Sequence, residues 1–497
     1  MASSKQLSTP KFPAPIYKET VLTHIFADGQ KHLLEPLLHL HYAHCVMLAR
    51  QRILTRAEAK TILRGLDKLN RTKIANAKYD GSVEDLYFYV ERELCDLIGE
   101  ELGGKLHIAR SRNDIDVTLY RMKLRSEILD LLDDYAALRE ALARLAQKHL
   151  TTVMPAHTHT QPAQPTTLAH YLCAALEFVS RDVTRLQAAY ANVNRNPLGA
   201  CAITTTGFPI KRETTASLLG FEGLVENSYY AVGGIDYLLE TMSAVATAAV
   251  SLGKFTQDLL LWATQEFAFI TLNDGFVQTS SIMPQKRNPV ALEHVRIQLS
   301  KAFGQAQAVM TTAHNTPFGD INDSEDPLQP LVYQTFSDAR RAVRLLAGAL
   351  DAVMVNKEAL RQKAAGSFLT MTELADTLVR KEGLSFKLAH RLVAQTAKRM
   401  PNAEVSHEQI VAVLQDTALA LLGKPLKSKR QELLQSLSPL NFVLVRTVIG
   451  GTAPKTVAQF LKRQTLEARQ AQRWLKAKQT ALAAFPAKIV QARKPLG

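Results

Sequence analysis

The chain has 497 residues, of which 46% are hydrophobic and 21% are charged, a composition that excludes a wholly disordered protein. This length predicts two or three domains, or one elongated helical body with end domains. The formal net charge of +14 is compatible with binding to nucleic acid, to an anionic membrane surface or to an acidic small molecule. No run of about 18 apolar residues is found, so we expect no membrane-spanning segment and no membrane partner.

Residues 1–30 are expected to form a flexible N-terminal tail. Residues 1–17 have no apolar core, so we do not expect a secretory signal. The cysteines lie far apart and form neither a C-x-x-C motif nor a metal-binding pattern, which is typical of reduced thiols in a cytoplasmic protein. They are Cys45, Cys95, Cys173 and Cys201.

Residues 31–116 are predicted to form an N-terminal helical domain. Apolar residues within 33–64 recur at steps of three and four, which is the spacing of a helix with one buried face. Thr55 and Glu58 have the spacing of a capping box, so a helix should begin directly after Thr55.

The segment 103–114, G-G-K-L-H-I-A-R-S-R-N-D, is a polar loop in front of the first long helical pattern. Arg112 offers two parallel donors that suit a carboxylate, and Ser111 and Asn113 add further donors. An alternative is that Arg112 pairs with an aspartate at the start of the next helix, because helix N-termini favour acidic residues. The sequence alone leaves both interpretations open.

Residues 117–365 are predicted to form a central domain built as a bundle of long helices. Apolar residues keep a helical period over many turns, and the first of these helices contains no Pro or Gly. Strand patterns are sparse, so we predict an all-α fold, with the central bundle flanked by two smaller helical domains. The helices are expected at residues 117–150, 168–189, 235–269 and 291–312.

A turn rich in Thr and His, residues 151–165, separates the first two long helices. His changes its charge near neutral pH, so His159 is a candidate for delivering a proton to a departing nitrogen. Thr158 is a candidate substrate contact. A lone His in such a turn is, however, more often a structural residue.

The loop 278–289, Q-T-S-S-I-M-P-Q-K-R-N-P, lies between two long helical patterns and contains two prolines, which cannot continue a helix. Ser280 near a cation and exposed amides could become basic enough to take a proton from carbon. Lys286 and Asn288 would then hold the negative charge that develops on an adjacent carboxylate. The alternative is a surface loop whose polar residues are merely solvated.

Residues 366–497 are predicted to form a C-terminal helical domain that ends in a basic tail. Lys and Arg residues within 455–494 are opposed by a single acid, Glu467. Such a run is more typical of a solvated helix face than of a nucleic-acid-binding surface. No aromatic-rich RNA-binding motif or Cys/His finger accompanies it.

The loop 280–289 resembles the loop shared by the fumarase/aspartase superfamily. Within it, P-Q-K-x-N-P is more similar to the argininosuccinate lyase branch than to the P-G-K-V-N-P of fumarases and aspartases. The segments 103–114 and 154–165 resemble G-K-L-H-T-G-R-S-R-N-D and M-P-x-Y-T-H-x-Q-x-A-Q-P of the same branch. With G-G-T-A-P at 450–454, the resemblance extends over nearly all of the chain from residue 30 onward.

This resemblance implies a carbon–nitrogen lyase that eliminates fumarate from an N-substituted L-aspartate. Ser280 would take the proton from Cβ, Lys286 and Asn288 would stabilise the resulting aci-carboxylate, and His159 with Glu293 would assist the leaving nitrogen. The implied substrate-binding residues are Ser111, Arg112, Asn113, Thr158, Ser281, Met283, Gln285 and Asn288.

The resemblance also implies a homotetramer whose active sites each combine segments of three protomers and need no metal or organic cofactor. The first substrate expected is argininosuccinate, cleaved to arginine and fumarate in arginine biosynthesis. The alternative is another N-substituted aspartate such as ethylenediamine-N,N'-disuccinate. Two alternatives belong to a different functional class: a non-catalytic scaffold, or a basic helical protein that binds nucleic acid. No nucleic-acid partner is expected.

Several positions depart from the branch pattern and bear on the substrate. Thr279 replaces a Gly in the loop, and His157 replaces an aromatic residue. Acidic residues stand where the branch has a Tyr and a Gln, so a guanidinium or amine would be favoured there over a carboxylate. The remaining departures are Leu40 and His41 in place of Gly-Ser, and Asp320, Glu325 and Leu328 in place of Tyr, Gln and Lys.

Overall fold

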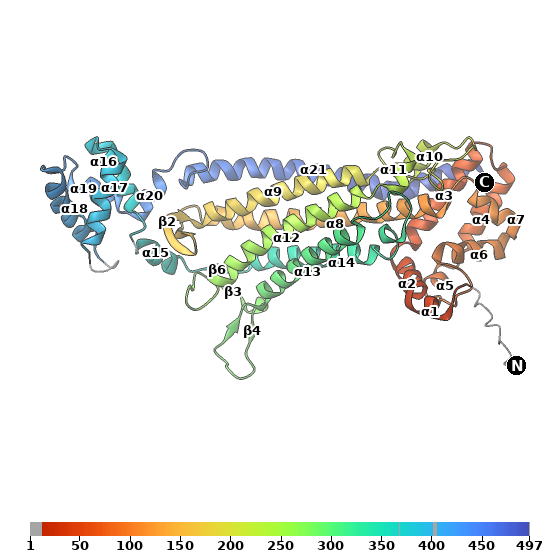
Figure 1. Ribbon diagram of the computed structural model, residues 1–497, viewed down its shortest axis with the longest axis horizontal. Coiled ribbons are helices and arrows are strands. Elements are labelled where there is room, and N and C mark those ends of the chain that lie inside the picture. The colour runs from red at the N-terminus through yellow and green to blue at the C-terminus, as the bar shows by residue number, and fades with distance from the viewer. Residues whose placement is uncertain (1–11, 367, 401–404, 497) are drawn as a thin grey trace, which may run out of the picture.

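The computed structural model describes residues 12–366, 368–400 and 405–496. Figure 1 shows an elongated molecule in which long helices run side by side and smaller helices gather at both ends. The predicted all-α fold with a central bundle is confirmed. In the described part of the chain, no helix is long and apolar enough to cross a bilayer.

Five long helices form the central bundle, and four of them match helices predicted from the sequence. The first, of 37 residues, spans about 55 Å at about 1.5 Å per residue. The helices are α8 (Arg112–Lys148), α9 (Leu168–Val193), α12 (Asp236–Trp262), α13 (Val290–Ala313) and α14 (Gln329–Asp351).

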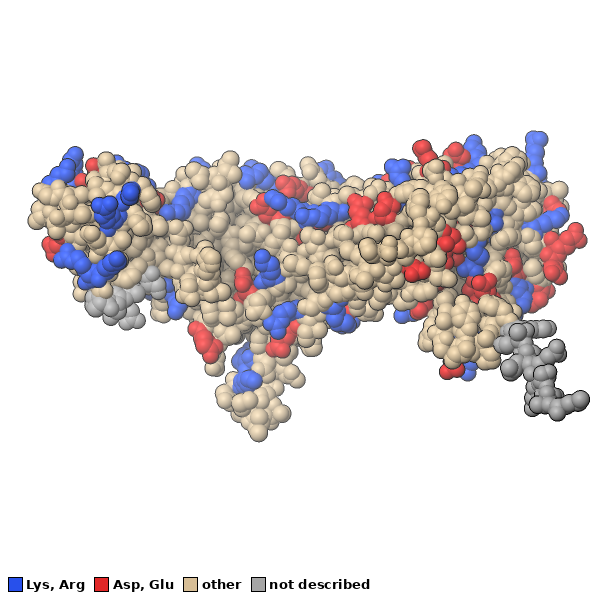
Figure 2. All heavy atoms as spheres, viewed as in Figure 1, with Lys and Arg blue, Asp and Glu red and all other residues tan. Residues whose placement is uncertain are grey.

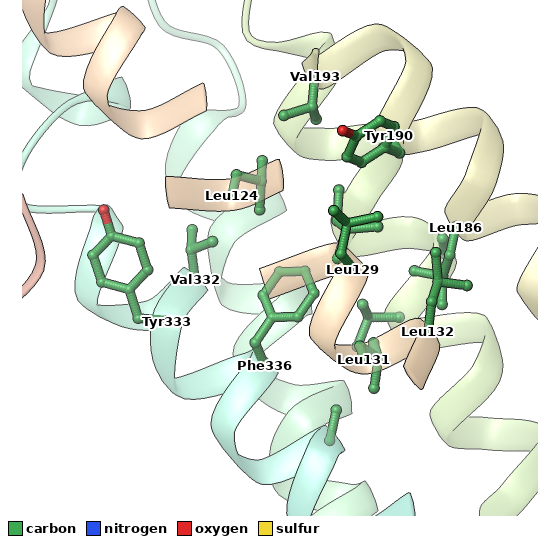
Figure 3. Close-up of a cluster of buried hydrophobic side chains, with 14 of the residues drawn as sticks. Leu124, Leu129, Leu131, Leu132, Leu186, Tyr190, Val193, Val332, Tyr333 and Phe336 are labelled. Carbon is green, nitrogen blue, oxygen red and sulfur yellow. The ribbon is translucent and has the colours of Figure 1, made fainter. Parts of the chain in front are cut away.

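The core of the bundle is built from the apolar faces that the helical period predicts. Side chains from α8, α9 and α14 interdigitate in its middle, where α8 contributes neighbouring leucines on more than one face (Figure 3). Burying several helices around one core explains why α8 is apolar over much of its circumference. The side chains labelled there are Leu124, Leu129, Leu131, Leu132, Leu186, Tyr190, Val193, Val332, Tyr333 and Phe336.

The N-terminal end is a cluster of shorter helices. The predicted capping box is confirmed, because Thr55 N–H donates to Glu58 Oε2 at 2.7 Å and Glu58 N–H donates to Thr55 Oγ1 at 3.2 Å. The helices are α3 (Leu34–Arg50), α4 (Arg56–Lys68), α5 (Arg71–Ala75), α6 (Leu86–Ile98) and α7 (Glu100–Gly104), and α10 (Arg212–Leu218) and α11 (Ser228–Gly233) lie near this end.

Residues 15–32, most of which were expected to belong to a flexible tail, are helical. They form α1 (Pro15–Tyr17), a π-helical turn and α2 (Thr23–His32). The physical reason is burial of Phe26, whose ring lies 5.2 Å from that of Tyr79 and 5.5 Å from that of Tyr89. Residues 1–11 of the expected tail lie outside the described residues.

The opposite end contains a small helical unit with its own apolar core, which includes Leu374, Leu392, Leu414 and Leu433. Gly383 and Gly423 end two of its helices with positive φ, as is usual for a C-terminal cap. The helices are α15 (Lys357–Ala365), α16 (Met371–Glu382), α17 (Phe386–Lys398), α18 (His407–Leu422), α19 (Arg430–Ser436) and α20 (Pro439–Leu444).

The final helix, α21 (Pro454–Arg493), returns along α8 and α9 to the N-terminal end (Figure 1). There the ring of Phe485 lies 5.1 Å from that of His39, and Arg493 forms a salt bridge with Asp67. The basic tail is therefore one continuous helix packed on the bundle. The boundaries of the three domains stay a prediction.

Three short antiparallel pairs interrupt the helices. They are β1 (Val153–Thr158) with β2 (Gln161–Thr167), β3 (Ile270–Leu272) with β6 (Val353–Val355), and β4 (Gln278–Thr279) with β5 (Arg287–Asn288). The helix predicted over 235–269 ends earlier, at Trp262. Ala268 adopts a φ of 50°, in the left-handed region that a right-handed helix cannot include, and β3 follows it.

Candidate active site

The three motifs found in the sequence lie at three different places along one chain (Figure 1). The β4–β5 hairpin with Ser280 projects from the side of the bundle. Arg112 begins α8 near the N-terminal end, whereas the β1–β2 hairpin with His159 follows the other end of that helix. One chain therefore does not bring Ser280, Arg112 and His159 together.

The Ser280 loop is shaped so that backbone amides point at the hydroxyl. Ser280 Oγ accepts hydrogen bonds from the N–H groups of Ile282 at 3.3 Å and Met283 at 3.1 Å. The loop is closed by Lys286 N–H, which donates to Met283 O at 3.0 Å. Two N–H donors aimed at one oxygen stabilise negative charge on it, which is what a serine base requires. The assignment of Ser280 as the base stays a prediction.

The hairpin that carries this loop is anchored at its base and open at its tip. Arg287 donates to Asp274 Oδ1 at 2.6 Å and to Leu272 O at 3.0 Å. Ile282 is 83% exposed, and Ser281, Met283, Gln285 and Lys286 are also exposed, whereas Asn288 is half-buried.

The loop carries a net positive charge within residues 275–288, and Arg287 is paired with Asp274 just before it. Residues 275–288 contain Lys286 and Arg287 but no acidic residue. In Figure 2 the end of the projecting hairpin shows uncharged side chains, and cationic side chains lie nearer its base. Lys286 forms no salt bridge with any carboxylate of the described ranges, so its charge is available to an anion.

The start of α8 is fixed by a buried carboxylate, Asp114. One of its oxygens accepts from Ser111 N–H at 2.8 Å, and the other from Gly199 N–H at 2.7 Å and Cys201 N–H at 3.0 Å. Burial raises the pKa of Asp114 to about 6, although these three donors oppose the rise. Asp114 therefore ties the loop at 199–201 to the residues next to Arg112.

Arg112 is held between two carboxylates. Its guanidinium donates to Asp116 Oδ2 at 2.7 Å and also pairs with Asp85, which caps the N-terminus of α6. The interpretation in which Arg112 pairs with an aspartate of the next helix is thus realised at Asp116. Asn113 Nδ2 donates to Ala202 O at 3.0 Å, and Ser111 Oγ donates to Asn113 Oδ1 at 3.0 Å.

Acidic residues from the segment 317–326 gather beside this arginine. Burial raises the pKa of Glu325 to about 9, and a hydrogen bond with Asp320 raises it further in the same direction. Burial likewise raises the pKa of Asp116 to about 7, against the opposing effect of Arg112, with Asp326 adding to the rise. The region holds more carboxylates than its one guanidinium neutralises, so it favours an added cation.

Three of the other departures from the branch pattern, Leu40, His41 and Leu328, lie in the core, whereas Thr279 is exposed and His157 is half-buried. Leu328 is 1% exposed, so it cannot contact a substrate. Leu40 and His41 are also buried, and His41 Nδ1 lies 3.0 Å from Arg110 Nη1. These three substitutions therefore act through packing.

His159 and Thr160 form the tip of the β1–β2 hairpin. Their φ angles are 50° and 62°, as in the two-residue turns that connect antiparallel strands, although most such turns use Gly or Asn. Thr158 and His159 are exposed, and His159 has no side-chain hydrogen bond to the described residues. Behind them, the half-buried His157 faces Phe267, with ring centroids 6.2 Å apart, and burial lowers its pKa.

Glu293 lies in the first turn of α13, directly after the β4–β5 hairpin, and is exposed. It therefore shares a protomer and a neighbourhood in the sequence with Ser280, but it has no contact with His159 of the same chain. Among the described residues, no three or more His, Cys, Asp or Glu side chains are arranged to hold a metal ion.

Sequence reasoning offered an aspartate of the next helix as a partner of Arg112, which is Asp116, but it missed Asp85 and Asp326. Tyr120 in turn donates to Asp326 Oδ1 at 2.5 Å. Asp116 carries a usable signal, because it lies four residues after Arg112 on one helix. Asp326 and Tyr120 are 206 residues apart, and no local pattern connects them.

Comparison with known proteins identifies the family. A family profile described as lyase matches residues 30–304, more than half of the chain, and one described as argininosuccinate lyase C-terminal matches residues 368–443. Argininosuccinate lyase 2 of Agrobacterium fabrum is 40% identical over 458 residues, which cover 92% of this chain and 91% of that relative. The argininosuccinate lyase of Methanosarcina barkeri is 39% identical over 85% of each chain.

Solved structures agree with this assignment. The crystal structure of EDDS lyase in complex with formate is 32% identical and superposes with a TM-score of 0.87 over 97% of this chain and 96% of that chain. A class II fumarase from Schistosoma mansoni, 16% identical, shares the fold with a TM-score of 0.66 over 84% and 91% of the two chains. The predicted family is therefore confirmed: this chain belongs to the argininosuccinate lyase branch of the fumarase/aspartase superfamily and is a carbon–nitrogen lyase.

Proposed function

We propose that this protein cleaves argininosuccinate to arginine and fumarate by removing a proton from the carbon next to a carboxylate. The observation that carries the proposal is the pair of backbone N–H donors on Ser280 Oγ, from Ile282 and Met283. A serine hydroxyl is a weak acid, and such donors together with the nearby Lys286 lower the cost of forming its alkoxide.

The reaction follows from the charges around this serine. Ser280 Oγ takes the proton from Cβ, and the electron pair moves into the adjacent carboxylate to give an aci-carboxylate. Lys286 and Asn288 stabilise its added charge. When the electron pair returns, the Cα–N bond breaks, fumarate forms, and His159 supplies a proton to the departing nitrogen.

This proposal requires more than one protomer at each site. The Ser280, Arg112 and His159 segments are apart in one chain, so we propose a homotetramer in which each site combines segments of three protomers. The apolar side chains that α12 and α13 leave exposed support association. They are Val250, Leu261, Ile297 and Phe303, of which Val250 and Phe303 line a groove of about 520 Å³.

The acidic residues beside Arg112 are proposed to receive the leaving group. Asp320 and Glu325 stand where the branch has neutral residues, and a guanidinium would offset their mutual repulsion. The same feature also suits a diamine, so ethylenediamine-N,N'-disuccinate is the second candidate. The likeness to EDDS lyase, at 32% identity and a TM-score of 0.87, supports that alternative.

The sequence also left open a scaffold without activity and a basic helical protein that binds nucleic acid. The geometry around Ser280 favours catalysis over both. The four cysteines are free thiols, so we propose a cytoplasmic location.

The test is fumarate release, followed by absorbance, from argininosuccinate and from ethylenediamine-N,N'-disuccinate. Ser280→Ala is expected to reduce kcat by at least about 10³-fold with either substrate, because the base is lost. Ser217→Ala, at an exposed position of α10 outside the Ser280 loop, is the matched control and should retain most of the rate. Near-normal turnover in Ser280→Ala would reject the serine as the base, and exclusive turnover of the diamine substrate would reject argininosuccinate.

A further inference from the structure

A cavity of about 330 Å³ lies between α8, α9 and α21, on helices that carry none of the residues assigned to the lyase reaction in this part of their length. Its walls are largely apolar and include Leu132, Leu176, Val183 and Leu475. Sites for small molecules are typically of about this volume, apolar, and equipped with a few polar groups that fix the ligand.

Arg139 is one of the polar residues that line this cavity, and it is buried. The residue is only 5% exposed, yet its one hydrogen bond is a long one, from Nη2 to Gln464 O at 3.4 Å. Its Nε has no partner among the described residues. A guanidinium has five N–H donors, so most of the donors of Arg139 are unused.

The charge of Arg139 is equally uncompensated. It forms no salt bridge with a carboxylate of the described ranges. Glu467 is the acid that acts on it, but the Glu467 carboxylate accepts from Gln464 Nε2 at 2.8 Å instead. Burial lowers the pKa of Arg139, as expected for a cation removed from water without a partner. A buried charge is normally paired, so the missing partner here is an anion.

The residues at the rim of the cavity are also mainly positively charged. Arg144 and Arg469 lie there, against one acid, Glu140. Arg144 already pairs with Glu140 at 3.4 Å and with Asp351 at 2.8 Å. Arg469 forms no salt bridge with the described residues, so the entrance favours negatively charged ligands.

We propose that this cavity binds a small monocarboxylate with an apolar chain, whose carboxylate pairs with Arg139 while the chain lies against the leucines of the three helices. Guanidinium and carboxylate match geometrically, because two parallel N–H donors face two oxygens. A multiply charged anion such as phosphate would leave the apolar walls unused. The site is separate from the lyase reaction, and its ligand would bind across α21 and the bundle.

The test uses the full-length protein and sodium octanoate, with binding measured by isothermal titration calorimetry. The wild-type protein should bind octanoate with a Kd below about 1 mM, and Arg139→Met should weaken this by at least about tenfold. Arg473→Met, which removes an exposed arginine of α21 outside the cavity, should leave the affinity unchanged. Octan-1-ol should bind the wild type and Arg139→Met alike, because it lacks the charge.

A second variant keeps the test decisive if Arg139→Met does not fold. Ala136→Phe fills the cavity from α8 and should abolish binding of both octanoate and octan-1-ol while fumarate release continues. Octanoate binding that is equal in the wild type and in either Arg139→Met or Ala136→Phe would overturn the proposal. So would the absence of octanoate binding to the wild type at millimolar concentration.

Discussion

The hydroxyl of Tyr120 donates a 2.5 Å hydrogen bond to Asp326 Oδ1. This bond links the N-terminal part of α8 to the segment that precedes α14. Tyr120 is buried, and this bond places the acidic segment 317–326 beside Arg112. The position of the acidic residues therefore depends on one phenol that takes no part in the reaction itself.

Tyr120→Phe is expected to lower the free energy of unfolding by about 1–3 kcal/mol, because a hydrogen bond from a buried hydroxyl to the half-buried carboxylate of Asp326 is lost. Urea denaturation followed by circular dichroism measures the change. Tyr229→Phe is the matched control, since Tyr229 is exposed and its hydroxyl makes no hydrogen bond within the described residues. Equal midpoints for Tyr120→Phe and the wild type would contradict the importance of this bond.

The carboxyl of Glu325 predicts a pH dependence of stability. Its pKa is raised from 4.5 to about 9 by burial and by Asp320. An acid whose pKa is higher in the folded state binds more protons there than in the unfolded state. Its stabilising effect is therefore complete below the unfolded pKa and is lost as the pH rises through the folded pKa. The Tm should therefore fall as the pH rises from about 4.5 to about 9.

Glu325→Gln should reduce this fall, because glutamine stays neutral at every pH. Differential scanning fluorimetry across the pH range provides the measurement, and Glu213→Gln, at an exposed position without a side-chain hydrogen bond in the described chain, is the control. If the Tm of Glu325→Gln falls as far as that of the wild type over the same pH interval, deprotonation of Glu325 is not the cause of the fall.

Variants at the tip of the β1–β2 hairpin can distinguish the effect of backbone strain on stability from the effect of the imidazole on catalysis. His159 and Thr160 both have positive φ, which costs a residue with a side chain about 1–2 kcal/mol relative to glycine. His159→Gly and Thr160→Gly should each maintain or raise the Tm. Only His159→Gly should reduce kcat, by about 10²–10⁴-fold, because it removes the imidazole.

Steady-state fumarate assays and thermal denaturation of both variants make the comparison. The outcome against the proposed role of His159 would be an equal loss of activity in the two variants, which would indicate that the shape of the turn matters and the imidazole does not.

The centre of the bundle should be sensitive to truncation. Phe336 is fully buried between α14 and α8, so Phe336→Ala is expected to cost about 3–5 kcal/mol in the free energy of unfolding. Leu466→Ala, at an exposed position of α21, should change stability by less than about 0.5 kcal/mol. Chemical denaturation of both variants checks the contrast, and similar losses for the two would argue against a tightly packed core.

The long helices, the cap at Thr55 and the shape of the Ser280 loop were predictable because each depends on residues close together in the sequence. The hairpin formed by β1 and β2 was not, since Pro-rich and Thr-rich segments obey no strict alternation and its turn uses His and Thr in place of Gly. The early end of α12 at Trp262 was not predicted either, because the apolar pattern continues through residues 263–269, which form a turn and lead into β3.

The residues of the candidate site also divide into those that local sequence motifs predict and those that they do not. Ser280, Lys286 and His159 were identified by their motifs, but the surroundings of Arg112 were not, because Asp85 and Asp326 reach it from distant parts of the chain. His41 and Leu328 stand at positions where the resemblance implies substrate-binding residues, and only burial shows that they belong to the core.

The return of α21 along the whole bundle affects how the protein is made. Phe485 and Arg493 pack against His39 and Asp67, which are synthesised several hundred residues earlier. The N-terminal helices therefore cannot complete these contacts until α21 has been synthesised, and a nascent chain must keep those surfaces from aggregating until then.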